Sequence, residues 1–238
     1  MPVIRVTVLL ALLALLGSCA SMDTESNIQK AGAHYKIGVG YLYENKIQLA
    51  FVEFQRAYEL QPGNKEVLNA IGIIYMQHYD DTVRAIEFFQ KAVQADPDYS
   101  EAYNNLGYAH SSLGKYEAAI PFYKKAVTNL LYTTPEKAFI NMGRAYYRLG
   151  RIDDAVASYK EAIKRAPSLD LPYFGLALCY NAMRKYGDAS AALSQAIVLN
   201  PQFRGSSKAA AEDFAARKAS APAHDQKDLS DYLEILKY

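Results

Sequence analysis

The chain has 238 residues, with 26 Lys and Arg against 25 Asp and Glu, so its formal net charge is close to zero. A nucleic-acid-binding protein is expected to carry a basic excess, and this composition therefore disfavours that class of partner. A chain of this length can form one ordinary domain or one short array of repeats.

Residues 1–18 combine one basic side chain, Arg5, with an apolar run from Val6 to Leu16. As a helix that run would be only about 16 Å long, roughly half the thickness of the hydrocarbon core of a bilayer. The segment is therefore predicted to be a signal peptide and not a membrane span. Its removal takes away Arg5 and no acidic residue, which leaves 25 basic and 25 acidic residues.

The apolar run ends at Leu16-Gly17-Ser18-Cys19, which resembles a bacterial lipobox. The resemblance implies cleavage before Cys19 and a covalent lipid on that residue, and we expect no cofactor apart from this lipid. The alternative is a free or disulfide-bonded cysteine beside an ordinary cleavage site. If Cys19 is lipidated, its two or more acyl chains are enough to anchor the protein stably in a membrane. Because Ala20 follows the cysteine instead of Asp, the resemblance implies an outer-membrane lipoprotein that faces the periplasm.

A linker is predicted over residues 19–30, and beyond it similar residues recur about every 34 positions through residues 31–203. The five units are 31–64, 65–99, 100–135, 136–169 and 170–203. In the first predicted helix of each unit, the recurring small residues are Gly38, Gly72, Gly107, Gly143 and Ala177. In the second, the recurring large residues are Phe54, Phe89, Tyr123, Tyr159 and Leu193. Small residues let two helices approach closely, while a large side chain fills the remaining gap.

This period and these positions resemble the tetratricopeptide repeat. The resemblance implies an all-α fold, a right-handed α-solenoid in which each helix pair buries its apolar face against its neighbours. Proline after the second helix stops that helix and closes four of the five units. These residues are Pro62, Pro97, Pro167 and Pro201.

Residue types that could perform catalysis have structural explanations in this pattern. His34 and His110 occupy core-packing positions, and Cys179 replaces small or apolar residues of the other units. The chain shows no Ser/His/Asp set, no metal-spaced His/Cys cluster and no phosphate-binding glycine loop. We therefore predict that the protein is not an enzyme and takes no small-molecule substrate. The alternative is an enzyme that uses His34 or His224.

Tetratricopeptide solenoids bind partners mainly through the concave face of their first helices, and the alignment predicts the exposed positions there. The first two units supply a mostly apolar set: Tyr35, Val39, Leu42, Tyr43, Asn69, Ile73 and Met76. The third and fourth supply a polar and then basic set: Asn104, Tyr108, Ser111, Ser112, Lys137, Arg144, Tyr147 and Arg148. We predict a protein partner with apolar anchors and an acidic stretch. The alternative is that curvature or residues 22–30 cover the apolar part.

The junction NLLYTTPEKA at residues 129–138 lengthens the third unit by two residues and lacks the usual Asp/Asn-Pro ending. Thr134 is predicted to be the N-cap of the next helix and Pro135 its first residue. The longer connection would leave Leu131 and Tyr132 near the surface, where they could make a second contact with a partner.

The junction, followed by FINMGRAYYRLG and preceded by YNNLGYAHSSLGKYEAAI, resembles the tetratricopeptide pilotin lipoproteins of type IV pilus machines. The resemblance covers roughly residues 31–203 and includes the lipobox. It implies binding to secretin subunits and promotion of their outer-membrane localisation and multimerisation. The alternative is a general periplasmic scaffold for a cell-envelope complex or for cell-wall hydrolases.

The pattern fades in residues 204–238. The stretch KAAAEDFAARKAS predicts a helix that caps the last repeat. Within residues 227–238, an apolar stripe of a further helix is formed by Leu229, Tyr232, Leu233 and Leu236. That helix is either a second cap or an arm that binds a partner.

Overall fold

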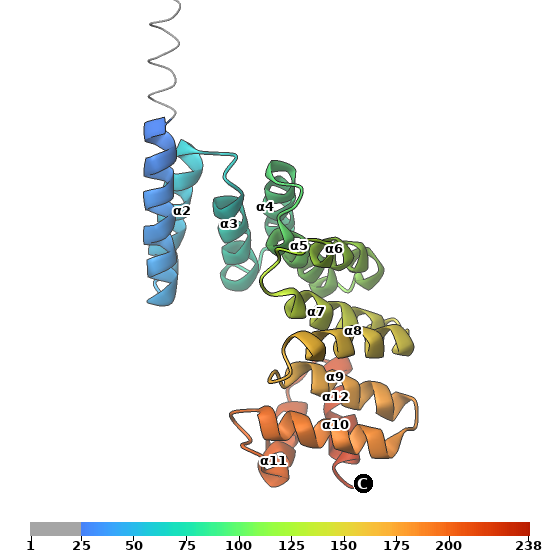
Figure 1. Ribbon diagram of the computed structural model, residues 1–238. Coiled ribbons are helices and arrows are strands. Elements are labelled where there is room, and N and C mark those ends of the chain that lie inside the picture. Colours follow the sequence, from blue (N-terminus) through green and yellow to red (C-terminus); the bar gives the residue numbers. More distant parts are fainter. Residues whose placement is uncertain (1–24) are drawn as a thin grey trace, which may run out of the picture. The chain divides into compact units, whose positions relative to one another are not determined.

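The computed structural model describes residues 25–238, and every regular element in that part of the chain is a helix (Figure 1). This confirms the predicted all-α fold class. The helices form two compact units, one that ends at Tyr99 and one from Ser100 to Tyr238. The predicted signal peptide and Cys19 lie outside the described residues. None of the helices within residues 25–238 is long and apolar enough to span a membrane.

Unit 1 consists of two helix pairs. Its elements are the helical residues 25–43, α2 (Ile47–Leu60), α3 (Lys65–His78) and α4 (Thr82–Ala95). Residues 25–30, which the sequence assigned to a linker, belong to the first of these helices. Because they continue that helix along its own axis, they do not fold back over its apolar side.

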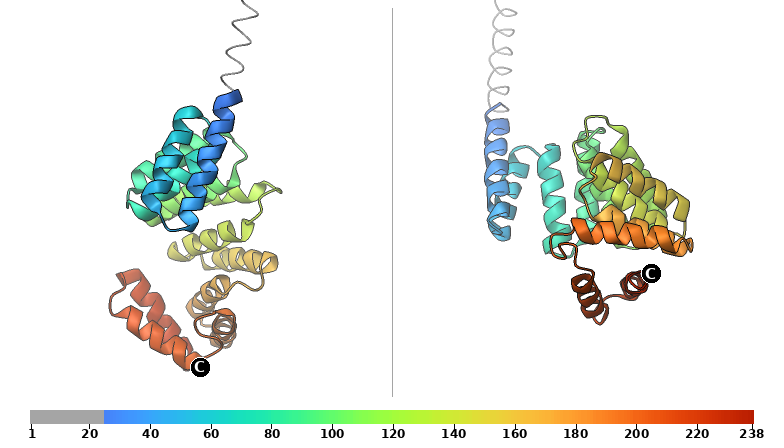
Figure 2. Two further views of the ribbon diagram at one scale, coloured as in Figure 1. Left: turned by 90° about the vertical axis from the view of Figure 1, so that its left-hand side faces the viewer. Right: turned by 60° about the horizontal axis from the view of Figure 1, so that its bottom comes forward.

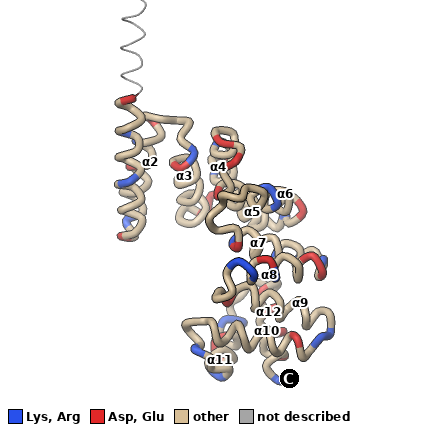
Figure 3. The backbone as a smooth tube through the Cα atoms, in the orientation of Figure 1, with Lys and Arg blue, Asp and Glu red and all other residues tan. Residues whose placement is uncertain are grey.

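Unit 2 consists of three helix pairs and a C-terminal hairpin of two helices, which lie side by side at its C-terminal end (Figure 2). The pairs are α5 (Ser100–Ser112) with α6 (Tyr116–Thr128), α7 (Pro135–Arg148) with α8 (Ile152–Arg165), and α9 (Leu171–Ala182) with α10 (Tyr186–Leu199). The hairpin consists of α11 (Ser207–Lys218) and α12 (Ala223–Ile235). Acidic and basic residues are interspersed along both units (Figure 3).

A buried aromatic ring lies against a glycine in four of the helix pairs, as the sequence predicted. A Cβ atom added to the glycine would meet ring carbons at 2.5–2.9 Å, closer than non-bonded atoms allow. The pairs are Gly38 with Phe54, Gly72 with Phe89, Gly107 with Tyr123 and Gly143 with Tyr159. The ring therefore fills the space that a side chain on the first helix would take, and the two backbones approach closely.

The fifth repeat uses a different glycine. Ala177 and Leu193 take the usual positions there, but a Cβ atom added to Gly175 would lie only 2.2 Å from Cζ of Tyr159 in the preceding repeat. Tyr159 thus contacts a glycine of its own repeat and a glycine of the next one. Gly175 is required by the contact between two repeats, which the alignment of single repeats did not indicate.

The turn inside each helix pair contains one residue with left-handed backbone geometry. The φ angles are 56° at Asn45, 52° at Asp80, 72° at Gly114, 73° at Gly150 and 59° at Arg184. In four of these turns a backbone amide donates a hydrogen bond to the carbonyl five residues before it, as in the 2.9 Å bond from Lys115 N to His110 O. In the second repeat, Asp81 N bonds to Tyr75 O, one residue farther back. The extra residue of the 35-residue unit is therefore absorbed in this turn.

The longer junction of the third repeat spans residues 129–134. The Asn129 side chain accepts a hydrogen bond from Leu131 N at 2.9 Å, and α7 begins at Pro135 with Thr134 as its N-cap residue. The predicted start of α7 is thus confirmed, although the Thr134 side chain makes no capping hydrogen bond. Neither flanking helix is interrupted by the two additional residues.

Candidate functional site

The predicted partner-binding residues of the first repeat mostly belong to the core of unit 1. Tyr35, Val39 and Leu42 are half-buried and pack against a cluster that includes Ala31, Phe54 and Ile71. The Tyr35 ring lies 5.7 Å from that of Phe54, and burial raises the pKa of Tyr35. Tyr43, in contrast, is 89% exposed. Their apolar character is therefore largely explained by packing within the unit.

In the second repeat, Asn69 is buried, whereas Ile73 and Met76 are half-buried. The prediction of an exposed Asn69 is wrong because the residue is only 8% exposed. The accessible apolar surface of unit 1 is consequently smaller than the sequence pattern indicated.

The histidines proposed for an enzyme have simple structural partners. His34 Nδ1 lies 2.6 Å from Glu53 Oε2, and Arg56 donates to Glu53 Oε1 at 2.6 Å. His224 Nε2 lies 3.3 Å from Asp225 Oδ1 at the surface. No group of three or more His, Cys, Asp or Glu residues that could hold a metal occurs within the part of the chain that the structure describes. Cys179 is a free, buried cysteine, as predicted.

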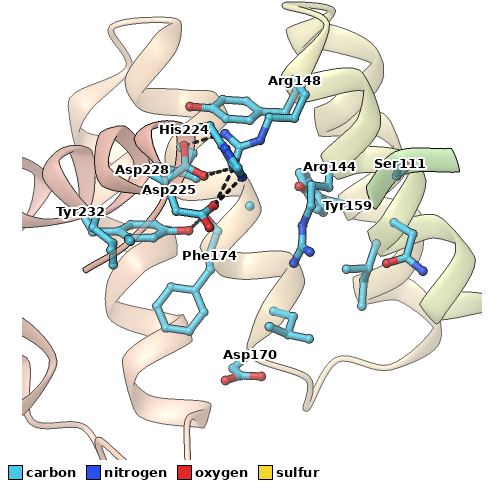
Figure 4. Close-up of a pocket in the computed structure, with 18 of the residues that line it drawn as sticks. Ser111, Arg144, Arg148, Tyr159, Asp170, Phe174, His224, Asp225, Asp228 and Tyr232 are labelled. Atoms are coloured by element: carbon cyan, nitrogen blue, oxygen red, sulfur yellow. Dashed lines mark hydrogen bonds and ion pairs between the residues drawn. The ribbon is translucent and has the colours of Figure 1, made fainter. Parts of the chain in front are cut away.

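Unit 2 contains a cavity of about 710 Å³ between the first helices of its repeats and the C-terminal hairpin (Figure 4). It brings together four of the predicted groove residues, namely Tyr108, Arg144, Tyr147 and Arg148. Ser111 and Ser112 also line it. Two other predicted residues do not: Lys137 is exposed at the start of α7, and Asn104 is buried and accepts a hydrogen bond from Asn141 at 3.1 Å.

The C-terminal helix α12 closes one side of this cavity through Arg148. The guanidinium donates to both carboxylate oxygens of Asp228, at 2.9 and 2.6 Å, and to Asp225 at 3.3 Å. The Arg148 side chain is only 13% exposed. A bidentate pair of this kind is stronger than an ordinary hydrogen bond. Arg148, which was predicted to contact an acidic stretch of a partner, is therefore paired with a carboxylate of its own chain.

Aromatic packing fixes α12 on the last repeat. The Tyr232 ring lies 5.5 Å from that of Phe174 on α9 and 5.1 Å from that of Phe214 on α11. Its hydroxyl donates to the Phe174 carbonyl at 3.3 Å, and Leu229 and Ile235 are buried. In this structure residues 227–238 thus pack as a second cap, and the predicted apolar stripe faces unit 2.

Arg144 differs from Arg148, although both lie on the same side of α7. Arg144 is exposed, points into the cavity and has no carboxylate partner among the described residues (Figure 4). Burial raises the pKa of the neighbouring Tyr123, Tyr147 and Tyr159 phenols, so these remain neutral at physiological pH. The Tyr123 hydroxyl lies 3.1 Å from Ser111 Oγ. The cavity thus offers one unpaired cation beside neutral hydroxyl groups.

The second predicted contact, at the junction of the third and fourth repeats, is corrected by the structure. Tyr132 is 7% exposed and packs with Ala126 and Ala138, so it does not lie at the surface. Leu131 is 86% exposed and Leu130 is 97% exposed. The tyrosine turns inward because small alanines of α6 and α7 leave room for its ring, and the two leucines are left outside.

Solved structures of similar fold include PilF, PilW and MamA. PilF of Pseudomonas aeruginosa is 18% identical, with a TM-score of 0.70 over 87% of this chain and 90% of that one. PilW, a widely conserved type IV pilus biogenesis factor, is 21% identical, with a TM-score of 0.66 over 87% of this chain and 98% of that one. MamA is 26% identical, with a TM-score of 0.59 over 68% of this chain and 94% of that one.

Curated relatives match shorter stretches. Two of them are 33% and 35% identical to this chain over 76 and 97 residues, and the chain spans only 11% and 10% of their length. A tetratricopeptide-repeat family model matches residues 35–100, and a model described as the C-terminal domain of cilia and flagella-associated protein 70 matches residues 78–206. Because the latter covers more than half of the 238 residues, the chain belongs to the tetratricopeptide-repeat family that this C-terminal domain represents.

Proposed function

We propose that this protein is an outer-membrane pilotin lipoprotein of a type IV pilus system. In this role it binds secretin subunits and promotes their localisation to the outer membrane and their multimerisation. The observation that carries the proposal is the shared fold over 90% of the solved PilF chain and 98% of the solved PilW chain. The lipobox at Cys19 supports the same role, because it supplies a membrane anchor for a protein-binding array.

In this proposal the lipid and the helix pairs have separate roles. The lipid on Cys19 holds the protein at the inner leaflet of the outer membrane, and the helix pairs bind the subunit. Binding needs no covalent chemistry, because apolar anchors and charge complementarity supply affinity and specificity. Tethering raises the local concentration of bound subunits at the membrane, which favours their assembly into a multimer.

The test is an immunoblot for heat- and detergent-resistant secretin multimers in cells that lack the protein, carry the wild type or carry Cys19→Ala. We expect the multimers to vanish in the deletion strain and to be reduced with Cys19→Ala, because the lipid serves targeting and not binding. Unchanged multimers in the deletion strain would overturn the proposal.

A general periplasmic scaffold for a cell-envelope complex or for cell-wall hydrolases is the second candidate. The similarity to MamA favours this second candidate, because MamA has a similar helix array and its name does not mention pili. This candidate predicts that crosslinking in intact cells recovers envelope proteins or hydrolases and that secretin multimers are normal in the deletion strain.

A further inference from the structure

We propose that the cavity of unit 2 binds a short extended segment of a protein partner, in which one Asp or Glu side chain pairs with Arg144. An apolar side chain beside that carboxylate lies against Phe174 and Leu171. The inference rests on the proposed function in so far as the ligand is a protein, but not on the identity of that protein. It assigns a recognition role to one arginine and distinguishes it from its neighbour Arg148.

The first argument is the chemistry that the chain already displays on this face of α7. Arg144 and Arg148 are four residues apart, so their side chains are neighbours, with about 5–6 Å between Cβ atoms. Arg148 binds the carboxylate of Asp228 in a bidentate manner. Arg144 lies beside it with the same fork of donors and no such partner within residues 25–238. A carboxylate on a second chain can therefore repeat the contact next to α12.

The second argument is the shape of the site. A volume of about 710 Å³ lies within the range of about 300–1,000 Å³ that is typical of pockets for compact ligands. A helix with its side chains is about 10–12 Å wide, and α12 already occupies the place of a helix in this groove (Figure 4). What remains open suits a few residues of extended chain.

The third argument is the polarity of the walls. The Ser111 hydroxyl and the Asn141 amide line the cavity near Arg144 and can bond to the backbone of an extended segment. Leu171, which is exposed, and Phe174, which is half-buried, also line the cavity, together with Asp170. Figure 4 shows the Phe174 and Asp170 side chains. An acidic side chain followed by an apolar one would meet both kinds of surface.

Charge excludes polyanions. Three carboxylates line the same cavity, from Asp170, Asp225 and Asp228. Arg148 is already paired to α12, and Arg217 is paired to Asp213. Since Asp225 and Asp228 balance the charge of Arg148, one guanidinium remains for a single carboxylate, which is too few cations to bind a nucleic acid or a diphosphate.

The experiment is a fluorescence-anisotropy titration of the purified, detergent-solubilised full-length protein with three labelled hexapeptides capped at both ends. One contains an aspartate followed by a phenylalanine among glycine and serine, one has asparagine in place of the aspartate, and one has alanine in place of the phenylalanine. We expect the first peptide to bind at least fivefold more tightly than either of the others. Arg144→Gln should remove the preference for aspartate over asparagine and leave the preference for phenylalanine.

Lys160→Gln is the matched control, because it removes one exposed positive charge from α8 of the same repeat. It should keep both preferences. Since Arg144 is exposed, the thermal unfolding of Arg144→Gln should equal that of the wild type, which excludes misfolding as the cause. Equal binding of all three peptides, no binding up to millimolar concentration, or binding of inorganic phosphate as tight as that of the first peptide would each overturn the proposal. This titration uses no secretin, so its failure is distinct from the failure of the pilotin role.

Discussion

At the scale of the residue, the aromatic rings and the small residues beneath them form pairs in which neither member can change alone. Tyr159 is the clearest case, because its ring lies on Gly143 and on Gly175. A methyl group at either glycine would have to displace the ring, because the added Cβ atom would lie 2.9 Å or less from ring carbons. The glycines are therefore determined by shape and not by backbone flexibility.

We predict that Gly175→Ala lowers the free energy of unfolding by about 1–3 kcal/mol, because overpacking forces the Tyr159 ring out of its place. The matched control is Gly187→Ala in α10, where an added Cβ atom meets nothing within 4 Å. That change should be neutral or stabilise by up to about 1 kcal/mol, since alanine has the higher helix propensity. Urea unfolding measures both variants, and equal effects would contradict the packing explanation.

His110 makes stability depend on pH. Burial, and then the charge of Lys115, lowers the pKa of His110, and its Nδ1 is buried without a hydrogen-bond partner. The unfolded chain therefore binds a proton near the ordinary pKa of about 6.5, whereas the folded chain binds it only at lower pH. The free energy of unfolding should fall as the pH drops below about 6.5 and through the folded-state pKa.

The variant that tests this effect is His110→Tyr, which places at this position the residue found in the four other repeats. Its free energy of unfolding should fall less between pH 7 and pH 5 than that of the wild type. Parallel pH profiles of the two proteins in urea titrations would show that His110 does not carry the dependence.

At the scale of the element, the main result is the position of α12. The helix contributes Tyr232 and Leu229 to the core of unit 2 and a carboxylate to Arg148. It therefore stabilises the last repeat and also determines which part of the groove stays open. Two contacts hold the hairpin on the repeats, the aromatic cluster around Phe214 and the ion pair of Asp228 with Arg148.

We predict that Asp228→Asn weakens the attachment of α12 and costs about 1.5–3 kcal/mol of stability, the range for hydrogen bonds to charged groups. Asp231→Asn on the same helix is the control, since Asp231 pairs with the exposed Lys227. An exposed pair contributes about 0–1 kcal/mol. Hydrogen exchange followed by mass spectrometry should show faster exchange in α12 for Asp228→Asn only, and equal exchange in the two variants would refute the role of the ion pair.

At the scale of the whole molecule, the chain divides into two units with separate cores. The core of unit 2 includes residues from α6 to α12 and needs no residue before Ser100. In repeat proteins each repeat contacts mainly its neighbours, so a part with its own caps can fold independently.

We predict that residues 100–238 expressed alone are helical by circular dichroism and unfold cooperatively in urea. The same fragment ending at Gly205 should be less stable, because Phe174 loses its contacts with Phe214 and Tyr232, and Phe203 loses its contact with Phe214. An unfolded 100–238 fragment would show that the two units depend on one another.

The sequence predicted those features that repeat and missed those that join distant parts. The period located the helix pairs, and the recurring small and large residues located the ring-on-glycine contacts. The Arg148–Asp228 pair joins residues 80 positions apart and follows from the fold of the C-terminal hairpin, for which no repeat provides a template. Tyr132 was predicted to lie near the surface because the sequence showed the length of the loop. It did not show that Ala126 and Ala138 leave room for the tyrosine ring between them.

The C-terminal hairpin also determines how copies of the chain can associate. A repeat array presents the same kind of apolar face at its growing end as it buries inside, and a head-to-tail contact between such ends has no geometric reason to close. Unit 2 ends instead in α11 and α12, whose outward side carries charged residues such as Lys227 and Glu234. The hairpin thus covers the apolar face of the last repeat and replaces it with a charged surface, which disfavours head-to-tail stacking of copies at this end.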